Sequence, residues 1–128
     1  MDYYLRKIIN IPFQEAVTKV TEALKKEGFG ILTKIDVQEK FKEKLGIDFK
    51  KYLILGACRP DYAHKAILAE ENIGVMLPCN VVVYEKDGET AVAVIKPTAA
   101  MDMIEKKDLK EIALQVENRL KNALDSVS

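Results

Sequence analysis

Two cysteines and the residues beside them are the side chains in this sequence best suited to chemistry. Cys58 is followed by Arg59 and Cys79 by Asn80, and the only histidine, His64, comes a few residues after Cys58. A thiol is a nucleophile, a soft-metal ligand or a small buried apolar group, and a neighbouring guanidinium or helix N-terminus favours the reactive thiolate. These five residues are therefore the candidate ligand-binding residues.

A soft-metal site is a weaker alternative. The cysteines, the histidine and one methionine would form a ligand set suited to Cu(I) or Zn, the candidate methionines being Met76, Met101 and Met103. The spacing matches no compact zinc pattern, because each block holds one cysteine. We therefore expect no metal and no other cofactor.

Motifs of known enzymes are absent from the sequence. It has no Gly-rich phosphate loop, no Gly-x-Ser-x-Gly elbow and no His-Glu-x-x-His motif. Cys58 and His64 could in principle form a nucleophile and its base, but no third member and no oxyanion donors can be named. The catalytic residues are thus unknown, and whether the protein is an enzyme stays open.

Length and charge narrow the class of protein. The chain has 128 residues, with 20 basic and 20 acidic side chains and a formal net charge of zero. We expect a single domain over residues 1–128, which can build a core without disulfide or metal. Neutrality argues against nucleic acid or an anionic membrane as a partner. No apolar run spans a bilayer, and the first residues do not form a secretory signal, so a cytoplasmic location is expected.

The elements that position the candidate residues follow from the hydrophobic pattern. Asp36 and Asp108 each precede a Glu by three residues, the spacing of a helix capping box. Asp87-Gly88 supplies the turn of a hairpin. The pattern predicts strands over 3–9, 30–35, 51–58, 81–84 and 91–95, and helices over 12–27, 37–45, 62–71 and from 108 onward.

The order of these elements predicts the fold class. It is β-α-β-α-β-α-β-β-α, which indicates a two-layer α+β domain with a mixed sheet covered mainly on one face. A doubly wound parallel sheet fits less well, because the closing hairpin is antiparallel and no Gly-rich loop follows the first strand.

Two sequence blocks resemble a known family. Residues 56–63 contain Gly-x-Cys-x-Pro with an alanine three beyond the proline, and residues 73–85 contain Ile-Gly and then Pro-Cys-Asn leading into a Val-rich strand. In these blocks the sequence resembles the family called domain of unknown function 302, most strongly from Asp36 to Pro97. The resemblance implies a compact α+β domain, often a homodimer, with no settled biochemical activity.

Two hypotheses about function remain. In the first, the protein is a binding or carrier module in which Cys58 and Cys79 line a site for a small ligand. In the second, it is a structural or interaction domain, a homodimer held by its sheet or its last helix, with both cysteines in the core.

Overall fold

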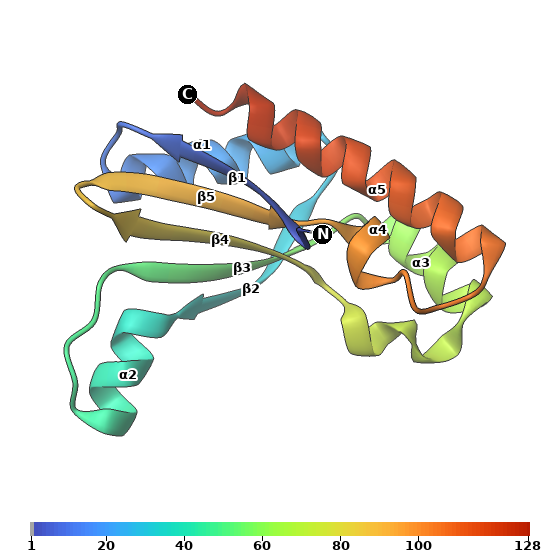
Figure 1. Cartoon of the computed structure of the whole chain (residues 1–128), viewed down its shortest axis with the longest axis horizontal. Helices are drawn as coiled ribbons and strands as arrows, with labels where there is room; N and C mark the ends of the chain where they lie inside the picture. Colours follow the sequence, from blue (N-terminus) through green and yellow to red (C-terminus); the bar gives the residue numbers. More distant parts are fainter. Residues whose placement is uncertain (1) are drawn as a thin grey trace.

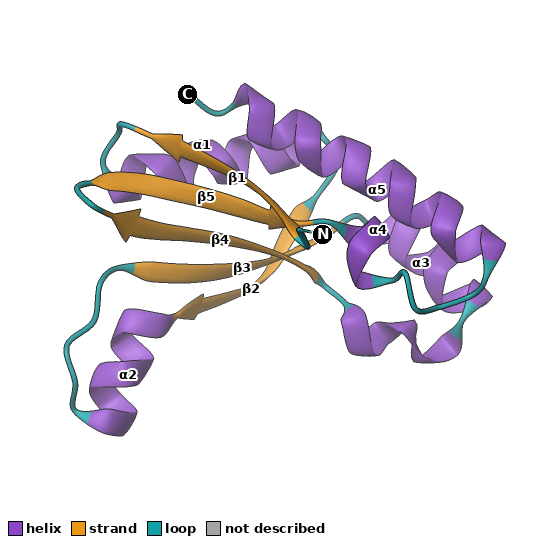
Figure 2. Ribbon diagram, viewed as in Figure 1, coloured by secondary structure: helices purple, strands orange, loops and turns teal. Residues whose placement is uncertain are grey.

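The computed structural model describes residues 2–128 and contains a five-stranded sheet with helices packed on one face (Figures 1 and 2). This confirms the α+β class and the predicted order of the main elements. A 3-10 helix, η1, and a short helix, α4, are additional. The elements are β1 (Tyr4–Ile9), α1 (Phe13–Lys26), β2 (Gly30–Asp36), α2 (Val37–Leu45), β3 (Tyr52–Cys58), α3 (Pro60–Ala69), η1 (Glu71–Met76), β4 (Cys79–Lys86), β5 (Glu89–Ile95), α4 (Pro97–Ala100) and α5 (Lys107–Ser126).

The sheet is antiparallel throughout, so the expectation of a mixed sheet was wrong. Its strand order is β1-β5-β4-β3-β2. All neighbouring strands pair antiparallel. β5 returns from its hairpin with β4 and lies between β4 and β1, antiparallel to both. β1 and β2 are the edge strands.

The main core lies between the sheet and helices α1 and α5. Alternate residues of the interior strands point to this side, among them Leu55, Val81 and Val83, and they pack with Leu24 and Leu120 of the helices. Burying a side chain of this size contributes roughly 1.5–3 kcal/mol to folding. Within residues 2–128, no helical layer covers the opposite face of the sheet.

A second apolar cluster extends the core beyond the ends of β3 and β4. It joins α3, η1 and α5 with the turn after α4, through Ala66, Ile73, Met101, Leu109 and Ala113. In Figure 1 these elements gather at one end of the sheet, while α2 projects at the other end.

Of three local features predicted from the sequence, a helix cap and a hairpin turn are confirmed and a second helix cap is not. The Glu39 amide donates to Asp36 Oδ1 at 3.0 Å, which confirms the cap of α2. Asp87 and Gly88 have φ values of 49° and 83°, which confirms the tight hairpin turn. The predicted cap at Asp108 does not form, because α5 begins at Lys107 and its N-cap residue is Lys106, two residues before Asp108.

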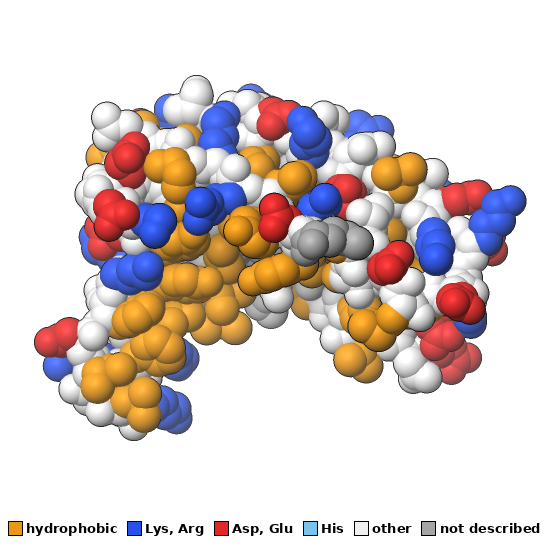
Figure 3. All heavy atoms as spheres, viewed as in Figure 1, with side chains coloured by type: hydrophobic (Ala, Val, Ile, Leu, Met, Phe, Trp, Pro, Cys, Tyr) orange, Lys and Arg blue, Asp and Glu red, His pale blue; other side chains and the backbone are white. Residues whose placement is uncertain are grey.

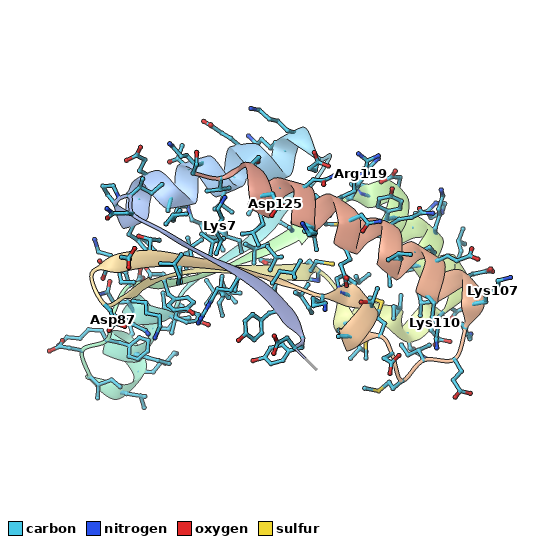
Figure 4. All side chains as sticks on the ribbon, turned by 45° about the horizontal axis from the view of Figure 1, so that its top comes forward. Lys7, Asp87, Lys107, Lys110, Arg119 and Asp125 are labelled. Atoms are coloured by element: carbon cyan, nitrogen blue, oxygen red, sulfur yellow. The ribbon has the colours of Figure 1, made fainter. Side chains whose placement is uncertain are left out.

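The last helix is tied to the first strand. Lys7 Nζ donates to the carbonyl oxygen of Asp125 at 3.1 Å and to that of Val127. Figure 4 shows Lys7 beside Asp125, and Lys107 and Lys110 at the far end of the helix. A lysine at this position satisfies carbonyls that the end of a helix leaves free.

Over the described residues, no helix is both long enough and apolar enough to cross a membrane.

Candidate functional site

The fold brings the two cysteine blocks together at one end of the sheet, where the interior strands β3 and β4 end and begin. Cys58 is the last residue of β3 and Cys79 the first of β4, and these strands are antiparallel neighbours with Cys79 opposite Ala57. The chain between them forms α3 and η1 and returns to the same end. The two residues thus come close although the sequence separates them by a helix.

Both cysteines line one cavity beneath the helices. Its other walls are mainly apolar and include small residues, so that space remains between the end of the sheet, α3 and α5. The cavity volume is about 30 Å³, which is room for one or two water molecules. Besides the cysteines it is lined by Phe29, Ala57, Arg59, Tyr62, Ala63, Ala66, Leu77, Pro78, Pro97, Met101, Ile112, Ala113 and Val116.

Burial keeps both thiols protonated. Cys79 is 8% exposed, and burial, with a smaller effect of the nearby Cys58, raises the pKa of its thiol to about 11. Burial also raises the pKa of the half-buried Cys58 thiol. The expectation that Arg59 and the start of α3 would favour a thiolate at Cys58 was therefore wrong, because burial disfavours the charged form of the thiol.

Arg59 is engaged with other groups. Its Nε lies 3.0 Å from Asp61 Oδ1, and its Nη1 donates to the carbonyl oxygen of Glu27 at 3.2 Å. Its guanidinium carbon is 4.6 Å from the centre of the Tyr62 ring, which is within range of a cation–π interaction. Arg59 is thus held at the rim of the cavity.

Two of the five candidate residues lie away from this cavity. His64 is exposed on α3, and Asn80 is exposed on the uncovered face of the sheet. Within residues 2–128, no three His, Cys, Asp or Glu side chains come together as metal ligands would. The geometry therefore unites Cys58, Arg59 and Cys79, and it does not join His64 to the thiols in a soft-metal site.

The contribution of the last helix to the cavity was not predicted from the sequence. Ile112, Ala113 and Val116 of α5 line the cavity, but their helical spacing indicated only a buried stripe. A hollow on the uncovered sheet face, lined by Tyr52, Tyr84 and other residues, was not predicted either. The available signal was Tyr52 in β3 and Tyr84 in β4, because each lies next to a buried residue, Leu53 or Val83, and so faces the opposite side of the sheet.

The fold and the cavity define a class: a small antiparallel α+β domain with two protonated thiols at one end of the sheet. Residues 6–127 match the model of the family "Domain of unknown function DUF302", and the chain belongs to this family. It is also similar to a crystal structure of an uncharacterized conserved DUF302 protein from Bacillus stearothermophilus, with 35% identity, a TM-score of 0.92 and 98% of each chain covered. Among curated proteins, none matches the chain.

Proposed function

We propose that this domain is a binding module whose site is the cavity lined by Cys58 and Cys79. The observation that carries this proposal is the convergence of both cysteines on one apolar cavity. Because the walls are apolar and the thiols are protonated, the ligand is small and uncharged. Charged ligands would lose their hydration without gaining a free partner, because Arg59 at the rim is already bonded to Asp61 and to the Glu27 carbonyl.

The cavity volume sets the size of the ligand. At about 30 Å³, the cavity holds only a few atoms unless its walls move. Met101 is the most adaptable wall residue, because the methionine side chain is unbranched and flexible. A larger ligand would enter by displacing it.

Xenon is a suitable probe, because it is apolar and fills small dry cavities. We expect dissolved xenon to shift the methyl resonances of Ala63, Ala66 and Ala113 in NMR spectra. Ala113→Val should reduce these shifts by filling the space. Ala123→Val is the matched control, since Ala123 is also buried on α5 but does not line the cavity. Absence of xenon shifts in the wild type, or shifts unchanged by Ala113→Val, would contradict the proposal.

A second candidate function is self-association through the α2 arm, which we define as residues 37–49. Helix α2 has no buried residue, and Leu45 is 65% exposed. So short a helix is only marginally stable without packing. In Figure 3, hydrophobic side chains gather over α2 and the underside of the sheet. These features favour an arm that packs against another molecule.

Charge favours a second copy of the chain as the partner. The first turn of α2 is acidic at Glu39 and the last turn is basic at Lys42 and Lys44. Two arms packed antiparallel about a two-fold axis would place each acidic end against a basic end. The zero net charge of the chain adds no repulsion between copies.

Sedimentation at micromolar concentrations tests this candidate. We expect a dimer that Leu45→Asp converts to a monomer, while Leu114→Asp on exposed α5 leaves the dimer intact. Circular dichroism would verify that both variants fold. A wild-type monomer, or a dimer that survives Leu45→Asp, would overturn the arm-mediated dimer.

A further inference from the structure

The uncovered face of the sheet carries a hollow between two pairs of tyrosines. At one end the rings of Tyr3 and Tyr4 meet edge to face, with centroids 5.0 Å apart. At the other end Tyr52 and Tyr84 are stacked, with centroids 5.3 Å apart and an interplanar angle of 16°. The hollow lies on the side of the sheet away from α1 and α5, and its volume is about 570 Å³.

The floor of the hollow is mainly apolar. Ala93 of β5 lies opposite Val82 of β4 and, on its other side, opposite Arg6 of β1. The small side chain of Ala93 leaves a recess between bulkier neighbours, and Ile95 continues the floor toward Tyr4. An apolar recess flanked by aromatic side chains suits a planar ring.

The hollow is positively charged. Arg6, Lys50 and Lys86 line it, and none of its lining residues within 2–128 is acidic. Lys86 lies 3.9 Å from Asp87, whereas in the described part of the chain neither Arg6 nor Lys50 pairs with a carboxylate. Arg6 Nη1 is 3.5 Å from the Tyr84 hydroxyl oxygen, and Lys50 Nζ is 4.9 Å from the centre of the Tyr84 ring.

These two cations are therefore available to an anion. The contact between Arg6 and Tyr84 is long for a hydrogen bond and easily exchanged for a charge-assisted one. Lys50 is close to the ring of the same tyrosine, so both cations lie beside Tyr84. A dianionic group such as a phosphate gains most from two converging cations.

We propose that this hollow binds a planar aromatic ring that carries a phosphate group, as a mononucleotide does. The ring lies on Val82 and Ala93 between the tyrosine pairs, and the phosphate lies between Arg6 and Lys50. Pockets for ligands of this size usually measure about 300–1,000 Å³. The hollow falls in that range, whereas the cysteine cavity is too small for such a ligand.

Titration calorimetry with adenosine 5′-monophosphate tests the proposal, with adenosine and inorganic phosphate as matched probes. We expect the monophosphate to bind more tightly than either part alone. Arg6→Gln and Lys50→Gln should each weaken its binding about tenfold and leave adenosine binding unchanged. Tyr84→Leu should weaken both. Lys110→Gln, an exposed change on α5, is the control for net charge.

Three results would overturn the proposal. The first is no binding of the monophosphate to the wild type. The second is equal weakening by Lys110→Gln and Arg6→Gln, which would indicate only a general charge effect. The third is much tighter binding of a single-stranded oligonucleotide than of the monophosphate, which would indicate a nucleic-acid strand as the ligand. Arg6 and Lys50 are exposed, so we expect their variants to fold. They therefore test the proposal even if Tyr84→Leu does not fold.

Discussion

Arg59 joins the start of α3 to the end of α1, because its Nη1 donates a hydrogen bond to the carbonyl oxygen of Glu27 at 3.2 Å. The same side chain lies against Gly28, where an added Cβ would come 3.2 Å from Arg59 Nε. Gly28 has φ +87°, a conformation that favours glycine. The tight end of α1 thus makes room for the arginine at the rim of the cavity.

Replacing this arginine should loosen the cavity rim. Arg59→Met keeps much of the apolar stem and loses the bonds to Glu27 and Asp61. We expect a loss of about 1–2 kcal/mol in the free energy of unfolding, measured with urea. Lys65→Met on the exposed side of α3 is the control. Equal stability of Arg59→Met and the control would show that these bonds contribute nothing.

The Cys79 thiol should make stability fall at alkaline pH. Its folded pKa is about 11, while an unfolded thiol has a pKa of about 8.5. The folded state therefore holds the proton more tightly, and stability present below about pH 8.5 is lost as the pH rises toward 11, by up to about 3 kcal/mol. The free energy of unfolding of the wild type and of Cys79→Ala is measured at pH 7, 8.5 and 10, and we expect it to fall more steeply with pH in the wild type. An equally steep fall in both proteins would contradict the prediction.

Gly56 should tolerate no side chain. A Cβ at this position would lie 2.1 Å from Thr33 Oγ1 and 2.7 Å from Pro78 Cγ. We expect Gly56→Ala to cost about 1–3 kcal/mol of stability through overpacking. Gly74→Ala is the matched control, because a Cβ there meets nothing within 4 Å. Thermal melting measures the loss of stability in both variants. Equal losses for Gly56→Ala and Gly74→Ala would contradict the prediction, because they would show that Thr33 and Pro78 can move away from an added Cβ at position 56.

Lys7 should protect the end of α5 from fraying. Lys7→Met removes the bonds to the carbonyls of Asp125 and Val127. We expect faster amide hydrogen exchange over residues 124–127 and a loss of about 1 kcal/mol in stability. Lys34→Met, on an exposed position of edge strand β2, provides the comparison. Unchanged exchange at the helix end would contradict the role of Lys7.

Local patterns predicted the elements, and long-range pairing decided their arrangement. The Asp87-Gly88 turn and the Asp36 cap depend on neighbouring residues, so both were visible in the sequence. The position of β5 between β1 and β4 depends on contacts across most of the chain, and no local pattern specifies it. For that reason the α+β class was right and the mixed sheet was wrong.

The candidate site was predicted in part for the same reason. The two cysteines were identified as candidates by residue type and local context, whereas their meeting depends on the pairing of β3 with β4, which the sequence did not specify. The protonation of the thiols was not predicted either, because it depends on their burial in the folded chain. The hollow of tyrosines went unseen because its members come from four strands and the segments next to them.

The α2 arm is an insertion in a β-hairpin. Asp36 at the end of β2 pairs with Leu53 near the start of β3, so a short turn could replace the whole arm without changing the register of the sheet. Phe49 joins the arm to the sheet through Tyr52, at a centroid distance of 6.5 Å. The arm is thus a part of the molecule that evolution or an engineer can exchange for another while the rest of the fold stays intact.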